Sequence, residues 1–337
     1  MAHDQVKKLT NNPDDVAPQA LEGLALAFPQ YLRKLPGIQA VVRRDAPVSS
    51  KVAIVTGGGS GHEPMFAGYV GRGMADASVA GNIFASPPPL PIFQAAKAAY
   101  GGEGVLFIYG NYSGDVLNFD MAAEMLEADN IRVQTVRVND DVASAPPERS
   151  QERRGIAGDL FVIKVAGARA EEGASLPEVC SAAEKAVHST RTMGVALTSC
   201  IIPASGRPIF ELGEQEMEIG MGLHGEPGVQ RGRLKPADQV AVEIVQRILA
   251  DLSVKAGEEL AVLVNGLGAT PLAELFIIFR AASHVLRESG ISIWRSYVGN
   301  YATSLDMAGA SVSFMRLDTE LKRWMSAPAE TPALVQV

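Results

Sequence analysis

The stretch KVAIVTGGGSGHEP, residues 51–64, indicates the fold class of this chain. Its first six residues form a short apolar run that stops at a cluster of glycines, the pattern of a buried strand that feeds a loop at its carboxyl end. The run GVLFIYG at 104–110 repeats this arrangement. Helical spacing follows each run, in PPPLPIFQAAKAAY and NFDMAAEMLEADN, before a further strand IRVQTVRV. This alternation predicts an α/β fold whose sheet is mostly parallel and flanked by helices.

The sequence changes character near residue 190, where short extended segments such as VALTSCIIP and MEIGMGLHGE replace the long helices. A helix at 237–252, a strand at 259–268 and a helix at 271–289 come later. Thr270 is expected to cap the last helix, with Gly290 just past its end. We therefore expect an N-terminal α/β domain at 1–190 and a smaller α+β domain at 191–337. The polar, proline-containing stretch 143–158 is expected to be an exposed loop of the first domain.

Composition narrows the class of ligand. The formal net charge is −8, and no cluster of Lys and Arg stands out that could hold a phosphate backbone, so nucleic acid is not the expected partner. Cys180 and Cys200 are the only cysteines, which argues against a structural zinc site or a disulfide framework. No apolar stretch approaches the roughly 20 residues of a membrane span. We expect a cytoplasmic protein that binds a small metabolite and holds no metal.

Two glycine-rich loops invite a nucleotide interpretation that their spacing does not support. The loop at 56–64 lacks the pattern of a P-loop, and GMGLHG at 220–225 is followed by Pro227 and Gly228 where a phosphate-binding helix should begin. The first loop is either a plain turn after a strand or a cradle for a small ligand. His62 and Glu63 follow its glycines directly, at the end of the strand where sites form, and favour the cradle.

The residues alone leave two alternatives open at the most reactive positions. Asp115 fits a helix cap, and it fits equally a general base paired with His62. His224 lacks a neighbouring acid or serine in the sequence and could be a packed residue, yet the glycines around it leave its imidazole accessible as a nucleophile. Glu63, Asn111, Glu226 and Asp306 are left without an assigned role, because each fits a turn or a cap equally well.

Five motifs, taken together and in this order, carry a resemblance to a known family. The chain from about residue 5 to residue 327 resembles the dihydroxyacetone kinase substrate-binding subunit. The motifs are TGGGSGHEPMFAGYVGRGMADASVAGNIFASPPP, NYSGDVLNFDMAAE, IPASGRPIFELGEQEMEIGMGLHGEPG, VNGLGATPLAEL and TSLDMAGASVSFMRLD.

The resemblance implies a role for each of the candidate residues. His224 is implied to attack the carbonyl of a short ketose and to hold it as a covalent hemiaminal, which excludes glycerol because glycerol has no carbonyl. His62 and Asp115 correspond to the family's acid/base pair, with Asp115 taking the proton of the terminal hydroxyl as it attacks the phosphoryl group. The implied contacts to the substrate are Gly59, Ser60, Gly61, His62, Gly110 and Asp115.

One position departs from the family pattern. Bacterial members specific for dihydroxyacetone carry a lysine five residues before the catalytic aspartate, where this chain has Gly110. A glycine removes a donor and a long side chain, so we expect more space at the ligand and infer a ketotetrose such as erythrulose as the alternative substrate. A non-catalytic ketose sensor that activates transcription is the other alternative. Retention of both His62 and Asp115 favours the kinase.

The resemblance also implies partners. The family's nucleotide and magnesium sites lie in a separate all-helical domain, so no cofactor is expected on this chain, and ADP or ATP with Mg²⁺ is expected on a helical partner subunit. The phosphoryl donor is then either ATP or a protein of the phosphotransferase system. The family further implies a homodimer.

Overall fold

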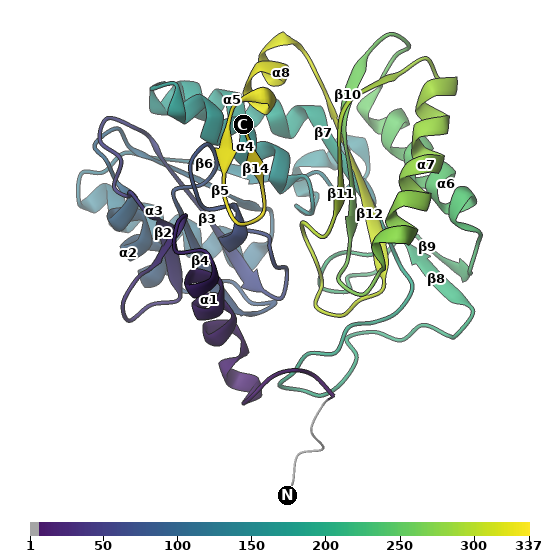
Figure 1. Cartoon of the computed structure of the whole chain (residues 1–337), viewed down its shortest axis with the longest axis horizontal. Coiled ribbons are helices and arrows are strands. Elements are labelled where there is room, and N and C mark those ends of the chain that lie inside the picture. Colours follow the sequence, from purple (N-terminus) through teal and green to yellow (C-terminus); the bar gives the residue numbers. More distant parts are fainter. Residues whose placement is uncertain (1–6) are drawn as a thin grey trace, which may run out of the picture.

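The structure, a computed structural model, describes residues 7–337, which form two six-stranded sheets that lie side by side (Figure 1). In the first sheet the order is β1-β2-β4-β3-β5-β6; β3, β4, β5 and β6 are parallel to one another and β1 and β2 pair antiparallel. The expectation of a mostly parallel sheet is confirmed. Its strands are β1 (Leu32–Lys34), β2 (Ala40–Arg43), β3 (Ala53–Ser60), β4 (Ala77–Ile83), β5 (Val105–Gly110) and β6 (Val133–Val138).

Helices cover both faces of the first sheet because its central strands are apolar on both sides. Successive side chains of β3 point to opposite faces, so Val55 packs with α2 (Pro89–Ala99) and α3 (Ser113–Ala128), whereas Ile54 packs on the side of α1 (Val16–Ala27) and α4 (Asp159–Glu171). Next to α4 lies α5 (Leu176–Ser189), whose first turn is held by a capping box between Ser175 and Glu178. None of the helices within residues 7–337 is both long enough and apolar enough to cross a bilayer.

The second sheet is mixed, with β10 and β11 parallel and its other pairings antiparallel, in the order β11-β10-β12-β7-β8-β9. One face packs against α6 (Ala237–Leu252) and α7 (Leu272–Glu288), and the other joins the core around α4 and α5. This agrees with the expected second α+β unit, while the boundary at residue 190 stays a prediction. Its strands are β7 (Thr190–Ala196), β8 (Glu216–Ile219), β9 (Gln230–Arg233), β10 (Glu259–Gly266), β11 (Ser292–Gly299) and β12 (Gly309–Arg316).

The C-terminal segment returns from the second sheet to the first half of the chain. Helix α8 (Thr319–Ser326) packs on α4, where the buried ammonium of Lys164 donates a hydrogen bond to the carbonyl oxygen of Trp324 at 2.8 Å. The short hairpin of β13 (Ala329–Glu330) and β14 (Val335–Gln336) then bridges to Arg72. In Figure 1 this segment lies between the two halves. It therefore helps to fix one half against the other.

Two local expectations are wrong. The stretch 143–158 is exposed only in its first part, which includes the short helix η3 (Pro147–Glu152); the side chain of Arg153 is buried and donates to both oxygens of Asp251 in α6, at 2.8 and 2.6 Å. Thr270 does not cap α7, because its hydroxyl bonds to both the N–H and the carbonyl of Gly309 on β12. In both cases a partner distant in the sequence determines where the polar group lies.

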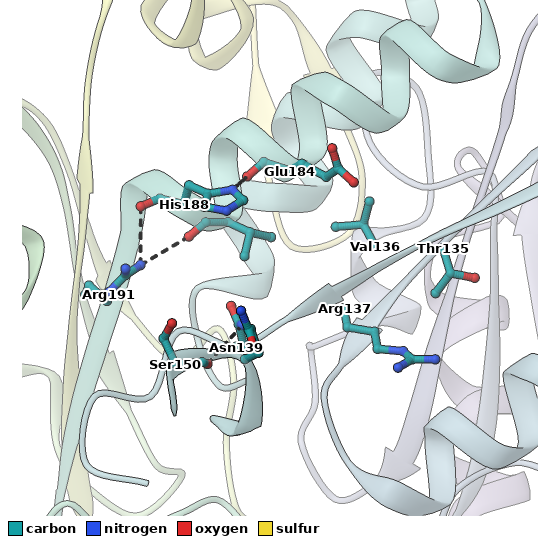
Figure 2. A pocket seen from close by; sticks show the side chains of 10 residues that line it. Thr135, Val136, Arg137, Asn139, Ser150, Glu184, His188 and Arg191 are labelled. Atoms are coloured by element: carbon teal, nitrogen blue, oxygen red, sulfur yellow. Dashed lines mark hydrogen bonds between the residues drawn. The ribbon is translucent and has the colours of Figure 1, made fainter. Parts of the chain in front are cut away.

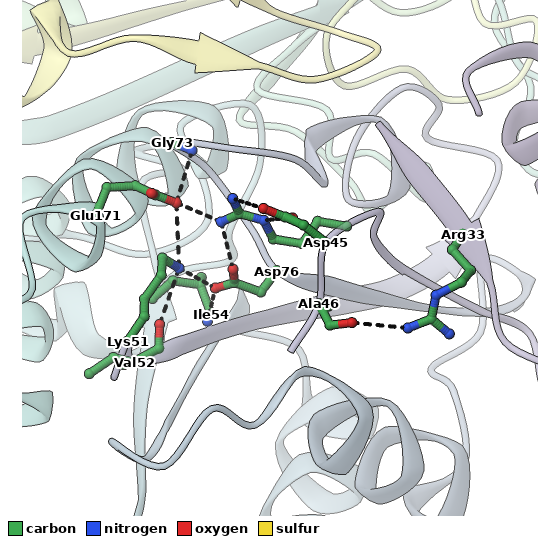
Figure 3. Close-up of polar contacts among 10 residues, drawn as sticks. Arg33, Asp45, Ala46, Lys51, Val52, Ile54, Gly73, Asp76 and Glu171 are labelled. Atoms are coloured by element: carbon green, nitrogen blue, oxygen red, sulfur yellow. Dashed lines mark hydrogen bonds and ion pairs between the residues drawn. The ribbon is translucent and has the colours of Figure 1, made fainter. Parts of the chain in front are cut away.

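A buried charged cluster holds the amino end of β3 and β4 (Figure 3). The carboxylate of Asp76 accepts from Arg43 at 3.0 Å, from Lys51 at 2.6 Å and from the backbone N–H of Ile54 at 2.7 Å. Arg43 also donates to Glu171, the last residue of α4, at 2.6 Å. The side chains of Arg43, Lys51 and Asp76 are each at least nine-tenths buried. The cluster joins β2, β3, β4 and α4 at the end of the sheet away from the glycines.

Candidate active site

The glycine run at the carboxyl end of β3 is part of the strand, not of a loop as expected from the sequence. An added Cβ would lie 2.4 Å from the ring of Phe66 at Gly58 and 2.8 Å from the Cα of Phe84 at Gly59. Gly61 has φ +102°, a backbone conformation that other residues rarely adopt, and the Phe84 ring lies just as close to it. These glycines therefore let the strand end pass tightly between two aromatic rings and present the next residue, His62.

His62 is buried and has one orientation. Its Nδ1 lies 2.7 Å from the carbonyl oxygen of Thr303, and its ring stacks on Phe84 with centroids 4.9 Å apart. A carbonyl can only accept, so Nδ1 carries the hydrogen and Nε2 is left with its lone pair. Burial, and then the nearby charge of His224, lower the pKa of His62 to about 3. The ring is therefore neutral near pH 7.

His224 comes from the second half of the chain, in the loop between β8 and β9, and meets His62 directly. The two Nε2 atoms lie 3.0 Å apart, although 162 positions separate the residues in the sequence. The rings of Phe84 and Tyr112 stand edge-on against the His224 ring, with centroids 5.2 and 4.8 Å away. About a quarter of the His224 side chain is exposed. The reactive nitrogen therefore lies between the two halves, in an aromatic surround that solvent can still reach.

Glu226 is the partner of His224 that sequence reasoning missed. One oxygen of its carboxylate accepts from Nδ1 of the ring at 3.0 Å, and the other accepts from the backbone N–H of His224, also at 3.0 Å. Burial alone would raise the pKa of Glu226, but the hydrogen bond and charge of His224 outweigh it and lower this pKa to about 2. The only signal in the sequence was the spacing of two residues within a glycine-rich turn.

These contacts determine how many protons the two histidines hold. The Thr303 carbonyl and the Glu226 carboxylate both only accept, so each ring carries a hydrogen on Nδ1. The two Nε2 atoms face each other at hydrogen-bond distance, which requires one further proton between them. A proton in that position is shared by the two rings and lies opposite the carboxylate of Glu226.

Asp115 is the third residue of α3, so it is not the cap of that helix; the capping position belongs to Tyr112. Its Oδ1 is buried and has no hydrogen-bond partner within residues 7–337. Burial raises the pKa of Asp115 to about 6, with the Ser86 hydroxyl and the charge of His224 acting in the opposite direction. Among the described residues no hydrogen bond joins Asp115 to His62, whose Nε2 faces His224 instead. The acid/base pairing of Asp115 with His62 stays a prediction.

The remaining substrate contacts implied by the sequence differ in their surroundings. The hydroxyl of Ser60 donates to the carbonyl of Gly81 at 2.7 Å and so helps to hold β3 beside β4. Gly110 ends β5, and an added Cβ there would lie 3.2 Å from the ring of Tyr112. The expected open space at Gly110 is therefore occupied on that side by Tyr112. The Tyr112 hydroxyl is buried and has no hydrogen-bond partner in the described part of the chain.

A separate hollow of about 410 Å³ lies between β6, η3 and α5 (Figure 2). Its polar side chains are engaged with the backbone: Asn139 donates to the carbonyl of Ser150 at 3.1 Å, and Nδ1 of His188 bonds to the carbonyl of Glu184 at 2.7 Å. Neither histidine of the pair lines it, and nor does Asp115. The first of these bonds holds the segment that leads into Arg153, whereas the second lies within α5.

Comparison with known proteins identifies the family. The chain is 46% identical to the dihydroxyacetone-binding subunit DhaK of PTS-dependent dihydroxyacetone kinase 2 from Listeria innocua, over 97% of this chain and 98% of that one. It is 43% identical to L-erythrulose 1-kinase from Mycolicibacterium smegmatis, over 96% of this chain and 57% of the longer relative. The solved structure of the dihydroxyacetone kinase operon co-activator Dha-DhaQ matches with a TM-score of 0.88 and 32% identity, covering 94% of this chain and 98% of that one. The Dak1 domain matches residues 22–333, and the chain belongs to this family.

Proposed function

We propose that this protein is the ketose-binding subunit of a dihydroxyacetone-type kinase, which holds a short ketose on His224 while a partner subunit phosphorylates its terminal hydroxyl. The observation that carries the proposal is the 3.0 Å contact between Nε2 of His62 and Nε2 of His224, each ring fixed by an acceptor at its other nitrogen. A nucleophile and a proton donor lie side by side, as carbonyl addition requires. The Listeria relative, a dihydroxyacetone-binding subunit, supports the choice of substrate.

The first step is addition of His224 to the ketose carbonyl. The shared proton passes to Nε2 of His62, which frees the lone pair on Nε2 of His224. That lone pair forms the bond to the carbonyl carbon, the π electrons of the carbonyl move onto its oxygen, and the oxygen takes the proton back from His62. The positive charge is now on the alkylated ring of His224, where it faces the Glu226 carboxylate at 3.0 Å. The covalent bond orients a substrate that offers few groups for binding.

The second step is phosphoryl transfer to the terminal hydroxyl, with Asp115 as its base. A base is most effective when its pKa lies near the working pH, and burial has moved the pKa of Asp115 to about 6. The nucleotide, ADP or ATP with Mg²⁺, is placed on a helical partner subunit, with ATP or a phosphotransferase-system protein as the donor. The L-erythrulose 1-kinase relative, of which the chain spans 57%, carries a further segment that this chain does not match, which is consistent with a division of labour. We also propose a homodimer, as the family implies.

Two other functions have specific support. The relationship to an erythrulose kinase favours a four-carbon ketose as the alternative substrate, although Tyr112 occupies one side of the space expected at Gly110. The co-activator structure favours a ketose sensor that does not phosphorylate. A sensor needs the nucleophile but no base, so the buried carboxylate of Asp115, whose Oδ1 has no partner among the described residues, favours the kinase over the sensor.

The test follows the carbonyl carbon of the ketose. Dihydroxyacetone and each enantiomer of erythrulose, labelled with ¹³C at the carbonyl, are added to ¹⁵N-labelled protein. We expect a tetrahedral carbon with scalar coupling to a histidine nitrogen, which the free ketone and its hydrate lack. His224→Ala should lose this signal, whereas His188→Ala, at an exposed histidine, should keep it. Asp115→Asn should keep the adduct and lose phosphoryl transfer with the partner. A wild-type protein that gives no such coupling with any of the ketoses contradicts the covalent mechanism.

A further inference from the structure

We propose that Glu226 is the positioning residue for the nucleophile: its carboxylate fixes the hydrogen of His224 on Nδ1 and aims Nε2 at the substrate, and Arg154 holds this carboxylate in place. The inference rests on the proposed function, because it assumes that His224 is the attacking group. It assigns a role to two charged residues for which sequence reasoning found none.

The first support is that Glu226 holds His224 at two points. It accepts from the ring at Nδ1 and from the backbone N–H of the same residue. The two donors bond to different oxygens of the carboxylate, whereas a glutamine amide in the same place would turn its NH₂ group toward one of them. With Nδ1 protonated, the lone pair needed for attack can only be on Nε2, which is the nitrogen that faces His62.

The second support is that Gly222, two residues before His224, leaves room for the Glu226 carboxylate. An added Cβ at Gly222 would lie 2.2 Å from Oε2 of Glu226 and 2.8 Å from Nη1 of Arg154. Gly222 does not have a positive φ, so its lack of a side chain is explained by these two neighbours and not by its backbone. The glycine run around His224 therefore admits the carboxylate and the guanidinium behind it.

The third support is the anchorage of Arg154 itself. Its guanidinium donates to the buried carboxylate of Asp141 at 3.0 Å from Nε and 2.7 Å from Nη2, and Nη1 lies 3.8 Å from Glu226. Its neighbour Arg153 is bound to Asp251 in α6. The segment that carries both arginines belongs to the first half, whereas Glu226 and His224 belong to the second. The orientation of the nucleophile is thus fixed from both halves of the molecule.

The fourth support is electrostatic. When Nε2 attacks, Nδ1 keeps its hydrogen and the ring becomes a cation, so the acceptor at Nδ1 must also stabilise a positive charge. An ionised carboxylate at 3.0 Å does this in the same way as the aspartate of a serine-protease triad, which orients its histidine and stabilises the imidazolium.

The decisive variants remove the carboxylate without touching the histidine. Glu226→Gln keeps the size of the side chain but offers one acceptor oxygen for two donors. Gly222→Ala leaves Glu226 in the chain but pushes its carboxylate away. Gly232→Ala is the matched control, because an added Cβ there meets nothing within 4 Å. In the ligand-free protein, ¹⁵N chemical shifts of the His224 ring report which nitrogen carries the hydrogen. Titration with the labelled ketose measures how tightly the protein forms the adduct.

In Glu226→Gln and Gly222→Ala, we expect the hydrogen of the His224 ring to be no longer fixed on Nδ1. The affinity for the ketose should fall by about 10- to 10⁴-fold. The upper figure is the loss in kcat when asparagine replaces the aspartate of a serine-protease triad. Gly232→Ala should match wild type in both. Phosphoryl transfer at saturating ketose should fall less than the affinity for ketose.

Unchanged ring nitrogens and an unchanged adduct in both variants would overturn the positioning role, while loss of the adduct in His224→Ala would leave the proposed function standing. Absence of the adduct from wild type would overturn the proposed function instead, and the nitrogen shifts of the ligand-free protein would still test the tautomer. If Glu226→Gln does not fold, Gly222→Ala gives the same two readings.

Discussion

The two ends of strands β3 and β4 bury polar groups in opposite ways. At the amino end, the Asp76 carboxylate receives hydrogen bonds from two cations and a backbone N–H. At the carboxyl end, near the glycines, Oδ1 of Asp115 and the hydroxyl of Tyr112 are buried with no partner. Buried polar groups in native proteins are nearly always paired, so these two groups, the unpaired set, support the proposed ligand site at this end; unpaired buried atoms also lie elsewhere among the described residues, for example on Asp159. The same strands thus separate a stabilising end from a reactive one.

The largest effect is expected at the paired end. Asp76→Ala removes the carboxylate that Arg43 and Lys51 share and leaves both buried cations with Glu171, and it should lower the free energy of unfolding by up to about 3–5 kcal/mol, the range for breaking a buried ion pair. Urea unfolding followed by circular dichroism measures this difference. The folded fraction should still form the ketose adduct, because the cluster lies at the other end of the sheet.

A matched control is Asp120→Ala, which breaks an ion pair with Arg137 whose two side chains are nearly half exposed. The ion pair between Asp120 and Arg137 should contribute at most about 1 kcal/mol to the free energy of unfolding. If Asp76→Ala costs no more than the control, the buried cluster does not carry the stability that its geometry implies, and the contrast between the two ends fails.

The next effect, opposite in sign, is expected at the reactive end. Burial raises the pKa of Asp115 to about 6, so the folded protein keeps this proton up to about pH 6, whereas the unfolded chain releases it near the ordinary aspartate pKa of 3.8. The folded state therefore binds more protons between these limits, and wild type loses stability as the pH rises from about 4 to 6. Asp115→Asn does not titrate, so above pH 6 it should be more stable than wild type, by up to roughly 3 kcal/mol.

Urea unfolding of both proteins across pH 4–8 measures this difference. The two stabilities should be closest near pH 4 and diverge up to about pH 6, and phosphoryl transfer should be lost in the variant throughout. A variant that is less stable than wild type at pH 7 would mean that the Asp115 carboxylate makes favourable contacts, and would remove it from the unpaired set.

The sequence predicted some of the residues at the two strand ends, but not the contacts between distant residues. Apolar runs ending at polar residues located His62 and Asp115, because the carboxyl ends of parallel strands share one edge. The contact between His62 and His224 could not be read from spacing, since it depends on how the two halves pack; the family resemblance implied a role for each residue but paired His62 with Asp115. Arg153 was taken as exposed because its segment is polar, and its partner Asp251 lies 98 positions away. Local patterns locate strand ends, but not which distant group they face.

The smallest effect is the coupling between the two ends. Strand β3 has eight residues, which at 3.3 Å per residue separates its ends by roughly 25 Å. Mutations that far apart and without shared partners are usually additive within about 0.5 kcal/mol. The double variant Asp76→Ala/Asp115→Asn is measured at pH 7 beside both single variants. Its change in the free energy of unfolding should therefore equal the sum of the changes in the two single variants. A coupling well above that limit would mean that the charge at the amino end acts on the carboxyl end through the sheet, and the raised pKa of Asp115 would then reflect that long-range interaction as well as its own burial.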